Sequence, residues 1–311
     1  MADTLVLGAT SMVGSHFVRN SGLSCAAAGR TDPRTVGIPV ERFEPVDLSD
    51  PLTLHRVVFN APEPTVINFA AVTDVDGIEA ERPSELNAAR GMAWTVNALA
   101  PAYVAHATDE SKKFLVHIST DFVFDGERGP YDETVPRSPY SSRLSWYGWT
   151  KSEGERRTTA MDPSAAIVRI AYPYRTDFPS KLDFARRILQ RYRSGTLPPM
   201  YTDQQISPTW IPDVTDALRW LIRERTAGIL HVASPTLTTP FEFATELVRR
   251  VEGRAVELPR GNLETSPSDR RRAPRPLHGG LKPARATRLR LRLTPWPAGI
   301  DQLLASPQSG Q

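Results

Sequence analysis

The 311-residue chain contains a single cysteine, Cys25, and no long hydrophobic run. One cysteine cannot form an intrachain disulfide or a cysteine-based zinc site, and its apolar surroundings are typical of an inert core residue. No apolar run approaches the ~20 residues of a membrane span, so we expect no transmembrane segment. The N-terminus lacks the basic and apolar regions of a secretory signal, and together these absences favour the reducing cytoplasm.

The charge balance by itself excludes few classes of function or partner. The formal net charge is only +3, and the sequence pI of about 9.1 reflects many arginines. Hydrophobic residues make up 40% of the chain and charged residues 23%, which is enough apolar material for a sizeable core. Because interleaved aromatics and a long basic face are missing, we expect no nucleic-acid partner.

Short apolar strands alternate with helical stretches in the first half of the chain, which predicts an α/β fold with a Rossmann-type, doubly wound parallel sheet. The second half is less regular and is dense in Pro, Arg and Gly. We predict a sheet domain at 1–172, to which 203–233 return, a smaller lobe at 173–202 and 234–305, and a disordered tail at 306–311. The expected strands are 4–7, 24–28, 65–69 and 113–119, and the expected helices are 12–20, 51–60, 83–108, 206–225 and 241–250.

A glycine loop follows the first predicted strand and opens the first predicted helix. Gly8 permits a sharp turn and Gly14 permits close packing of helix on sheet, so the loop amides face an anionic pyrophosphate. Ser11 stands where such loops carry a middle glycine, and an ordinary tight turn is the alternative interpretation. The candidate dinucleotide-binding residues here are Gly8, Thr10, Ser11, Met12, Val13 and Gly14.

Cofactor choice depends on the end of the second strand, where an acidic residue suits NAD and an arginine suits the 2′-phosphate of NADP. Arg30 occupies this place, and Asp32 comes too late in the chain to be the acidic ligand. We therefore favour NADP(H) over NAD(H), with a solvated loop arginine as the alternative. Asp47, followed by Leu48, is placed to bind the adenine amino group or to cap the helix that follows.

Tyr147 and Lys151 lie four residues apart in a Tyr-x-x-x-Lys motif, which places both on one face of a helix. A nearby ammonium lowers the pKa of a phenol, so this pair can protonate a carbonyl oxygen while a nicotinamide delivers hydride. By itself the motif is weak evidence for a catalytic site, since side-chain pairs on the surface of any helix can have the same spacing of four residues. Thr120, at the end of a predicted strand, adds a hydroxyl that can orient the carbonyl.

At these residues the chain resembles the extended short-chain dehydrogenase/reductases, and within them the dTDP-4-dehydrorhamnose reductase family. The segment Asp203-Gln204-Gln205-Ile206-Ser207-Pro208-Thr209 is the most discriminating of several matches that occur in order along nearly the whole chain. Phe122 stands where the family usually has tyrosine. The matching blocks are 66–76, 96–101, 117–126, 147–155, 203–209 and 228–232.

The resemblance implies a role for each matched residue. Thr120, Tyr147 and Lys151 would form the catalytic triad, and Tyr147 and Lys151 would also contact the cofactor. The remaining implied positions are Ala70, Ala71, Thr73 and Asn97 along the cofactor channel, and Thr73, Asp74, Val75, Thr120 and Gln205 near the substrate. Trp146 lies outside the matched blocks and is a further candidate substrate contact because it precedes the motif tyrosine. Asn97 has an alternative as a partner for buried backbone groups.

Two features leave the substrate open. The loop between Pro139 and Tyr147 is longer than is usual in the family, and Trp146 and Trp149 flank the tyrosine. The C-terminal stretch is arginine-rich, and we expect one of its cations to bind a pyrophosphate while most are solvated. These cations are Arg270, Arg271, Arg272, Arg275, Lys282, Arg285 and Arg288.

The leading prediction is an enzyme that uses NADPH to reduce the 4-keto group of a nucleotide-linked deoxysugar, with dTDP as the expected nucleotide. The alternatives are a cofactor-binding regulatory subunit, which the intact triad disfavours, and an epimerase or dehydratase of the same superfamily. Dehydratases usually carry Asp-Glu after the threonine, whereas Thr120 precedes Asp121-Phe122. No metal site is predicted, a homodimer is compatible with the sequence, and the sugar's stereochemistry is left open.

Overall fold

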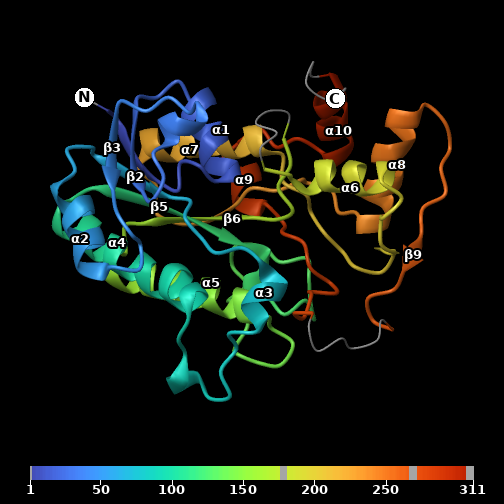
Figure 1. The fold of residues 1–311 in the computed structure, drawn as a ribbon, viewed down its shortest axis with the longest axis horizontal. Helices are drawn as coiled ribbons and strands as arrows, with labels where there is room; N and C mark the ends of the chain where they lie inside the picture. Colours follow the sequence, from blue (N-terminus) through green and yellow to red (C-terminus); the bar gives the residue numbers. More distant parts are fainter. Residues whose placement is uncertain (1, 176–180, 266–271, 306–311) are drawn as a thin grey trace.

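The computed structural model describes residues 2–175, 181–265 and 272–305, so the prediction for the tail 306–311 lies outside the described residues. The predicted fold class is confirmed, because seven parallel strands form one sheet in the order β3-β2-β1-β4-β5-β6-β8 (Figure 1). The strands are β1 Thr4–Leu7, β2 Cys25–Gly29, β3 Arg42–Pro45, β4 Thr65–Asn68, β5 Phe114–Thr120, β6 Ala166–Ile170 and β8 Gly228–His231.

The central strands are nearly continuous apolar runs because helices cover both faces of the sheet. All residues of β1, β4, β5 and β6 are buried, and Cys25 is buried at the start of β2. Figure 1 shows α1 and α7 on one face and α2, α4 and α5 on the other. These helices are α1 Met12–Asn20, α7 Ile211–Glu224, α2 Pro51–Asn60, α4 Ala100–Glu110 and α5 Trp146–Met161.

The strand order reverses direction between β1 and β4, and ligands of such sheets bind in the crevice at this switch point. The glycine loop follows β1, residues 69–73 follow β4, and Thr120 ends β5. The candidate residues therefore meet at the carboxyl edge of the sheet.

Helices to the right of the sheet in Figure 1 pack around a further hydrophobic cluster. It is built around Tyr174, Trp210 and Phe243, with side chains from three helices. The helices are α6 Phe184–Arg193, α8 Pro240–Glu252 and α10 Trp296–Ala305, and a small parallel pair joins β7 Met200–Tyr201 to β9 Arg260–Gly261. The division into a sheet domain and a smaller lobe at 173–202 and 234–305 stays a prediction.

Two predicted helices are wrong in extent. The stretch 83–108 is helical only from its middle, because Gly91 has a φ of 96° and a short 3-10 turn, Leu86–Ala88, precedes it. The helix expected at 206–225 begins at Ile211, since the backbone of Ile206 instead bonds to that of Thr238. Throughout the described ranges, every helix is too short or too polar to cross a membrane.

Candidate active site

The glycine loop has the geometry that the motif predicts. Gly8 has a φ of 78°, and a Cβ added there would lie 2.7 Å from the backbone nitrogen of Ala70. A Cβ added at Gly14 would lie 2.5 Å from the carbonyl oxygen of Gly8. Ser11 fits in place of a glycine because its Oγ turns into the helix, where it accepts the Gly14 amide at 3.0 Å and caps α1.

A small cavity of about 230 Å³ opens beside this loop, at the ends of β1, β2 and β4. Its wall includes Arg30 from the end of β2 and Asp47 from the loop before α2. Arg30 lies close enough to Asp47 to help lower the pKa of that carboxyl, whose hydrogen bonds to Ser49 contribute most of the shift. The candidate residues that line the cavity are Gly8, Thr10, Ser11, Arg30, Asp47, Leu48, Ala70 and Ala71.

Asp32 is already engaged by its neighbour. Its carboxylate accepts the Arg34 guanidinium at 2.6 Å and the Arg34 amide at 3.0 Å, and it caps a 3-10 turn. The carboxylate of Asp32 is therefore already paired with Arg34, whereas Arg30 lies in the cavity wall, together with Asp47 and Lys181.

A much larger cavity of about 1660 Å³ continues from the small one along the carboxyl edge of the sheet. Ser11, Ala71 and Lys181 line both cavities, so the two adjoin, and together they are called the channel below. The candidate residues that line the large cavity are Ser11, Met12, Val13, Ala71, Thr73, Val75, Thr120, Tyr147 and Lys151. The channel thus brings the glycine loop and the Tyr-x-x-x-Lys motif into a single site.

Tyr147 lies in the first turn of α5, directly against the end of β5. Gly148 makes this approach possible, since a Cβ there would collide with the carbonyl oxygen of Phe122. The Ser145 hydroxyl accepts the Gly148 amide at 3.0 Å and fixes the start of the helix. Burial raises the pKa of the Tyr147 phenol, and a hydrogen bond with the Thr120 side chain opposes that shift. The phenol is therefore protonated at neutral pH.

Lys151 lies one turn further along α5 and is buried. Its Nζ donates to the Ile118 carbonyl at 2.8 Å and lies 3.4 Å from Nε2 of His117. Burial lowers the pKa of this ammonium to about 8, and the nearby Glu155 carboxylate opposes the shift. The expected net lowering of the Tyr147 pKa is not found, because burial of the phenol raises that pKa above its ordinary value.

Asn97 is fully buried and does not face either cavity. It lies in a π-helical turn, Trp94–Leu99, whose altered spacing turns its side chain toward the loop after β4. Its amide accepts the Val72 backbone N–H and donates to the Val72 carbonyl, each at 2.9 Å, and it also donates to Thr150. Asn97 therefore holds the loop that carries Ala71 and Thr73, as its alternative interpretation proposed.

Three predicted substrate contacts lie elsewhere. Trp146 is fully buried and stacks on Trp94 with ring centroids 5.8 Å apart, because the first turn of α5 packs inward. Asp74 caps the short helix α3, Val75–Glu79, through the Gly77 amide. The backbone of Gln205 pairs with that of His278 in an extended bridge. Side chains of adjacent residues in extended backbone point to opposite sides, so the side chain of Gln204, and not that of Gln205, lines the cavity.

The cavity wall also contains two residues, Asp121 and Tyr172, that were not predicted from the sequence to belong to the site. Asp121 is buried, and its carboxylate accepts a hydrogen bond from the Thr120 hydroxyl at 3.0 Å. Burial raises the pKa of the Asp121 carboxyl to about 7. Tyr172 follows β6 and accepts a hydrogen bond from Gln204 at 3.0 Å. Asp121 directly follows β5, and Tyr172 lies two residues beyond the end of β6, so the strand-end rule applied to every strand points to both of them.

Some arginines of the C-terminal stretch line the large cavity, and another makes structural hydrogen bonds. Arg272 and Arg275 line the large cavity, and Arg275 binds both carboxylate oxygens of Asp76 at 2.9 Å. Arg285 instead donates to the backbone carbonyls of Ile229 and Ala227, so it is structural. Arg270 and Arg271 lie outside the described residues. From the other side of the cavity, α6 and the segment before it contribute Lys181, Arg187 and Arg191.

Sequence comparison places the chain among known proteins. The family model of the RmlD substrate binding domain matches residues 2–309. A probable low-salt glycan biosynthesis reductase from Haloferax volcanii is 29% identical over 80% of this chain and 80% of its own. A probable dTDP-4,6-dihydroxy-2-methyloxan-3-one 4-ketoreductase from Streptomyces antibioticus is 30% identical over 89% of this chain and 85% of its own.

Solved structures give the same picture. A dTDP-4-dehydrorhamnose reductase from Clostridium acetobutylicum is 25% identical, with a TM-score of 0.77 over 97% of this chain and 98% of the other. A dTDP-4-dehydrorhamnose reductase from Bacillus anthracis, solved in complex with NADP, is 22% identical, with a TM-score of 0.77 over 98% of this chain and 99% of the other. At 22% identity, the Bacillus anthracis structure supports the fold of this chain and not its function.

Proposed function

Since the chain belongs to the RmlD substrate binding domain family, we propose that it reduces the 4-keto group of a dTDP-linked deoxysugar with NADPH. The carrying observation is the large cavity, whose wall holds both the glycine loop at Ser11–Val13 and the side chains of Tyr147, Lys151 and Thr120. The names of the relatives, a 4-ketoreductase and a dTDP-4-dehydrorhamnose reductase, support the reaction class.

The residues of the small cavity fit a dinucleotide. Added side chains at Gly8 and Gly14 would fill the space between loop, helix and sheet, and the amides at the start of α1 offer unpaired donors to a pyrophosphate. Bound here, the reduced nicotinamide supplies the hydride. Ser11 and Ala71 line the passage between the cavities, so the nicotinamide end belongs beside Tyr147.

Three side chains of the chain itself carry out the polar part of the reaction. The protonated Tyr147 phenol donates its proton to the carbonyl oxygen as negative charge develops there. Thr120 orients that oxygen through its hydroxyl, which lies beside the phenol. The buried Lys151 ammonium stabilises the phenolate that the transfer leaves behind, since unlike charges attract strongly where water is excluded.

The large cavity suits an anionic sugar nucleotide. Lys181, Arg187 and Arg191 line it on one side, and Arg272 and Arg275 approach from the C-terminal segment. Arginines bind phosphate oxygens in bidentate fashion, so we assign the diphosphate to this basic side and the sugar to the end near Tyr147. Thr73 and Val75 line the wall beside the proposed sugar position.

We further propose a preference for NADP(H), carried by Arg30. Replacing Arg30 with Ala is expected to weaken NADPH binding about 10- to 100-fold, because a charge-assisted contact to the 2′-phosphate contributes roughly 1.5–3 kcal/mol. NADH binding changes little, since NADH lacks that phosphate. Fluorescence titration of both nucleotides measures the difference.

Arg34 offers a matched control for this experiment. It is also an exposed arginine after β2, but its guanidinium is bound to Asp32. Arg34→Ala is expected to leave both affinities nearly unchanged. Equal losses of NADPH and NADH affinity in Arg30→Ala would contradict the cofactor assignment.

The pH dependence of turnover is a second prediction. The lowered pKa of Lys151, about 8, means that its ammonium is charged below that pH and is lost as the pH rises through it. We expect kcat/KM for ketone reduction to fall on the alkaline side of pH 8 in buffers of constant ionic strength. Lys151→Arg stays charged throughout. An identical alkaline fall in an active Lys151→Arg enzyme would show that another group is responsible.

Turnover itself is tested with purified protein, NADPH and a panel of dTDP-4-keto-6-deoxysugars, followed by absorbance of the reduced nicotinamide. The proposal expects oxidation of NADPH with at least one of them. NADPH binding without oxidation of any panel member would instead favour a regulatory subunit.

A further inference from the structure

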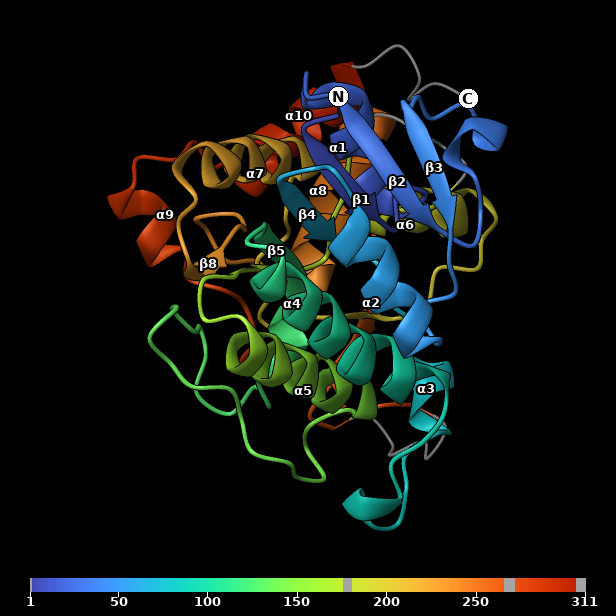
Figure 2. The same cartoon turned by 90° about the vertical axis from the view of Figure 1, so that its left-hand side faces the viewer.

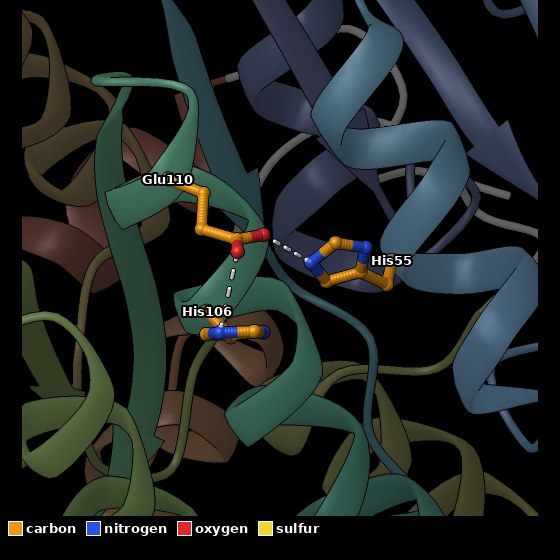
Figure 3. Close-up of side chains that lie close together, drawn as sticks. All are labelled: His55, His106 and Glu110. Atoms are coloured by element: carbon orange, nitrogen blue, oxygen red, sulfur yellow. Dashed lines mark hydrogen bonds and ion pairs between the residues drawn. The ribbon is translucent and has the colours of Figure 1, made fainter.

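Two histidines and a glutamate form a cluster on the helical layer (Figure 3), and none of the three lines either cavity described above. His55 comes from α2, and His106 and Glu110 lie one turn apart on α4. One ligand atom from each residue lies within 4.8 Å of the others. Nε2 of His55 is 2.8 Å from one Glu110 carboxylate oxygen, and Nε2 of His106 is 3.6 Å from the other.

The three side chains are gathered closely enough to share one ion. A tetrahedral ion with bonds of about 2.1 Å holds its ligand atoms about 3.4 Å apart. The His106–Glu110 separation of 3.6 Å is close to this value, whereas the His55–Glu110 separation of 2.8 Å is shorter, as in a direct hydrogen bond that an ion would replace. The two imidazoles are 5.1 Å apart between centroids and tilted by 40°, so their ring nitrogens converge on the carboxylate rather than stacking flat (Figure 3). Small side-chain rotations would complete the geometry.

The helices supply a rigid frame for these three side chains. α2 and α4 lie side by side in Figures 1 and 2, and Leu54, Val58 and Val104 belong to one buried cluster with the sheet. His106 and Glu110 are separated by one helical turn, a spacing that places two ligands on the same face. His55 directly follows the buried Leu54, so packing of α2 fixes where its ring emerges.

The donor set selects the kind of ion. Two imidazole nitrogens and one carboxylate suit Zn²⁺ and its neighbours among the divalent transition metals, whereas Mg²⁺ and Ca²⁺ prefer oxygen ligands. The side chains are 27%, 52% and 43% exposed for His55, His106 and Glu110, so water can fill the remaining positions.

The cluster lies far from the reacting groups. Glu110 ends α4 just before β5, whereas Thr120 ends that strand. At about 3.3 Å per residue, the seven residues of β5 place the two sites roughly 20 Å apart along the sheet. An ion there cannot touch the substrate, but it would join two helices that cover the sheet.

We propose that His55, His106 and Glu110 form a binding site for a divalent transition metal, Zn²⁺ in the first instance, that cross-links α2 to α4. The ion stabilises the folded chain because the unfolded chain does not hold the three ligands together. The site is structural and takes no part in ketone reduction.

The test uses the full chain without a polyhistidine tag, stripped of metal with a chelator. Titration with Zn²⁺ by calorimetry is expected to show saturable one-to-one binding and a raised melting temperature. Co²⁺ is expected to give the absorption bands of a low-symmetry site with nitrogen and oxygen ligands. Mg²⁺ is expected to give neither effect.

Variants assign the signal to the cluster. His106→Ala and, independently, Glu110→Gln should each weaken Zn²⁺ binding at least about tenfold while NADPH binding persists as a check of folding. Asp109→Asn removes the adjacent exposed carboxylate on α4 and should bind Zn²⁺ like the unmodified chain. No saturable Zn²⁺ binding, or an affinity in both cluster variants equal to that of the unmodified chain, would show that the cluster is an ordinary surface ion pair.

Discussion

Replacing Tyr147 with Phe is expected to lower kcat for ketone reduction by about 10²–10⁴, the usual contribution of a positioned proton donor. The variant keeps the ring, which contacts Phe122 edge-on with centroids 5.6 Å apart, and loses only the hydroxyl beside Thr120. Its NADPH affinity should therefore be nearly unchanged. Single-turnover kinetics with a 4-keto sugar nucleotide separate this loss from any change in binding.

Tyr172 provides the control for this variant. It is a second, partly buried tyrosine in the same cavity wall, but its hydroxyl accepts a hydrogen bond from Gln204. Tyr172→Phe should keep most of kcat, because that phenol is not beside Thr120 and Lys151. A Tyr147→Phe enzyme with the unmodified rate would remove Tyr147 from the proposed mechanism.

A second large effect is expected at Arg169, on stability rather than on chemistry. This fully buried arginine of β6 binds both carboxylate oxygens of Glu155, at 2.7 and 2.9 Å. Burial would raise the pKa of Glu155, yet the Arg169 charge and hydrogen bonds outweigh it and hold that pKa below its usual value. The guanidinium also lies 5.0 Å from the centroid of the Phe124 ring.

Arg169→Met is expected to destabilise the fold by about 3–5 kcal/mol, because it leaves a buried carboxylate without its main partner. Arg137, 3.5 Å from Glu155, is too distant to replace both hydrogen bonds. Urea unfolding followed by circular dichroism measures the change.

The matched control is an ion pair on the exposed side of α5. Arg156 binds Glu153 with distances of 2.9 and 3.0 Å, similar to the buried pair, but its side chain is 52% exposed. Arg156→Met should cost less than about 1 kcal/mol. Adding Glu155→Leu to Arg169→Met should restore much of the lost stability. Equal effects of the buried and exposed substitutions would contradict this assignment.

The sequence predicted the sheet and the positions of the glycine loop and motif well, because these depend on local patterns. Strands buried on both faces are continuous apolar runs, and Gly8 and Gly14 occupy places where a side chain has no room. The same local rules overextended two helices. The helical pattern of residues 83–93 is interrupted by Gly91, and Ile206 is drawn into backbone pairing with Thr238.

The wall of the substrate cavity was harder to predict because it depends on which way a side chain turns. Trp146 precedes the motif tyrosine by one residue, yet the helix directs it into the core against Trp94. Gln204 and Gln205 are adjacent in a matched block, and only the extended backbone decides that Gln204 faces the cavity. Arg275 reaches the site from a distant segment, which no local pattern reveals.

The pKa values show a further limit of sequence reasoning. A lysine one turn from a tyrosine predicts a lowered phenol pKa, but the size of the burial effect depends on the whole packed structure. In the folded chain that effect raises the pKa of Tyr147 and lowers that of Lys151. The motif therefore identifies the pair, and the structure determines that the tyrosine begins as the acid.

Transfer of deuterium from NADPH labelled at the nicotinamide C4 tests the central claim most directly. The proposed function predicts that a dTDP-4-keto-6-deoxysugar product carries the label on sugar carbon 4, as NMR would show, and that Tyr147→Phe forms this product far more slowly. Label on another sugar carbon, or an epimerised product that still carries its ketone and no label, would contradict reduction of the 4-keto group.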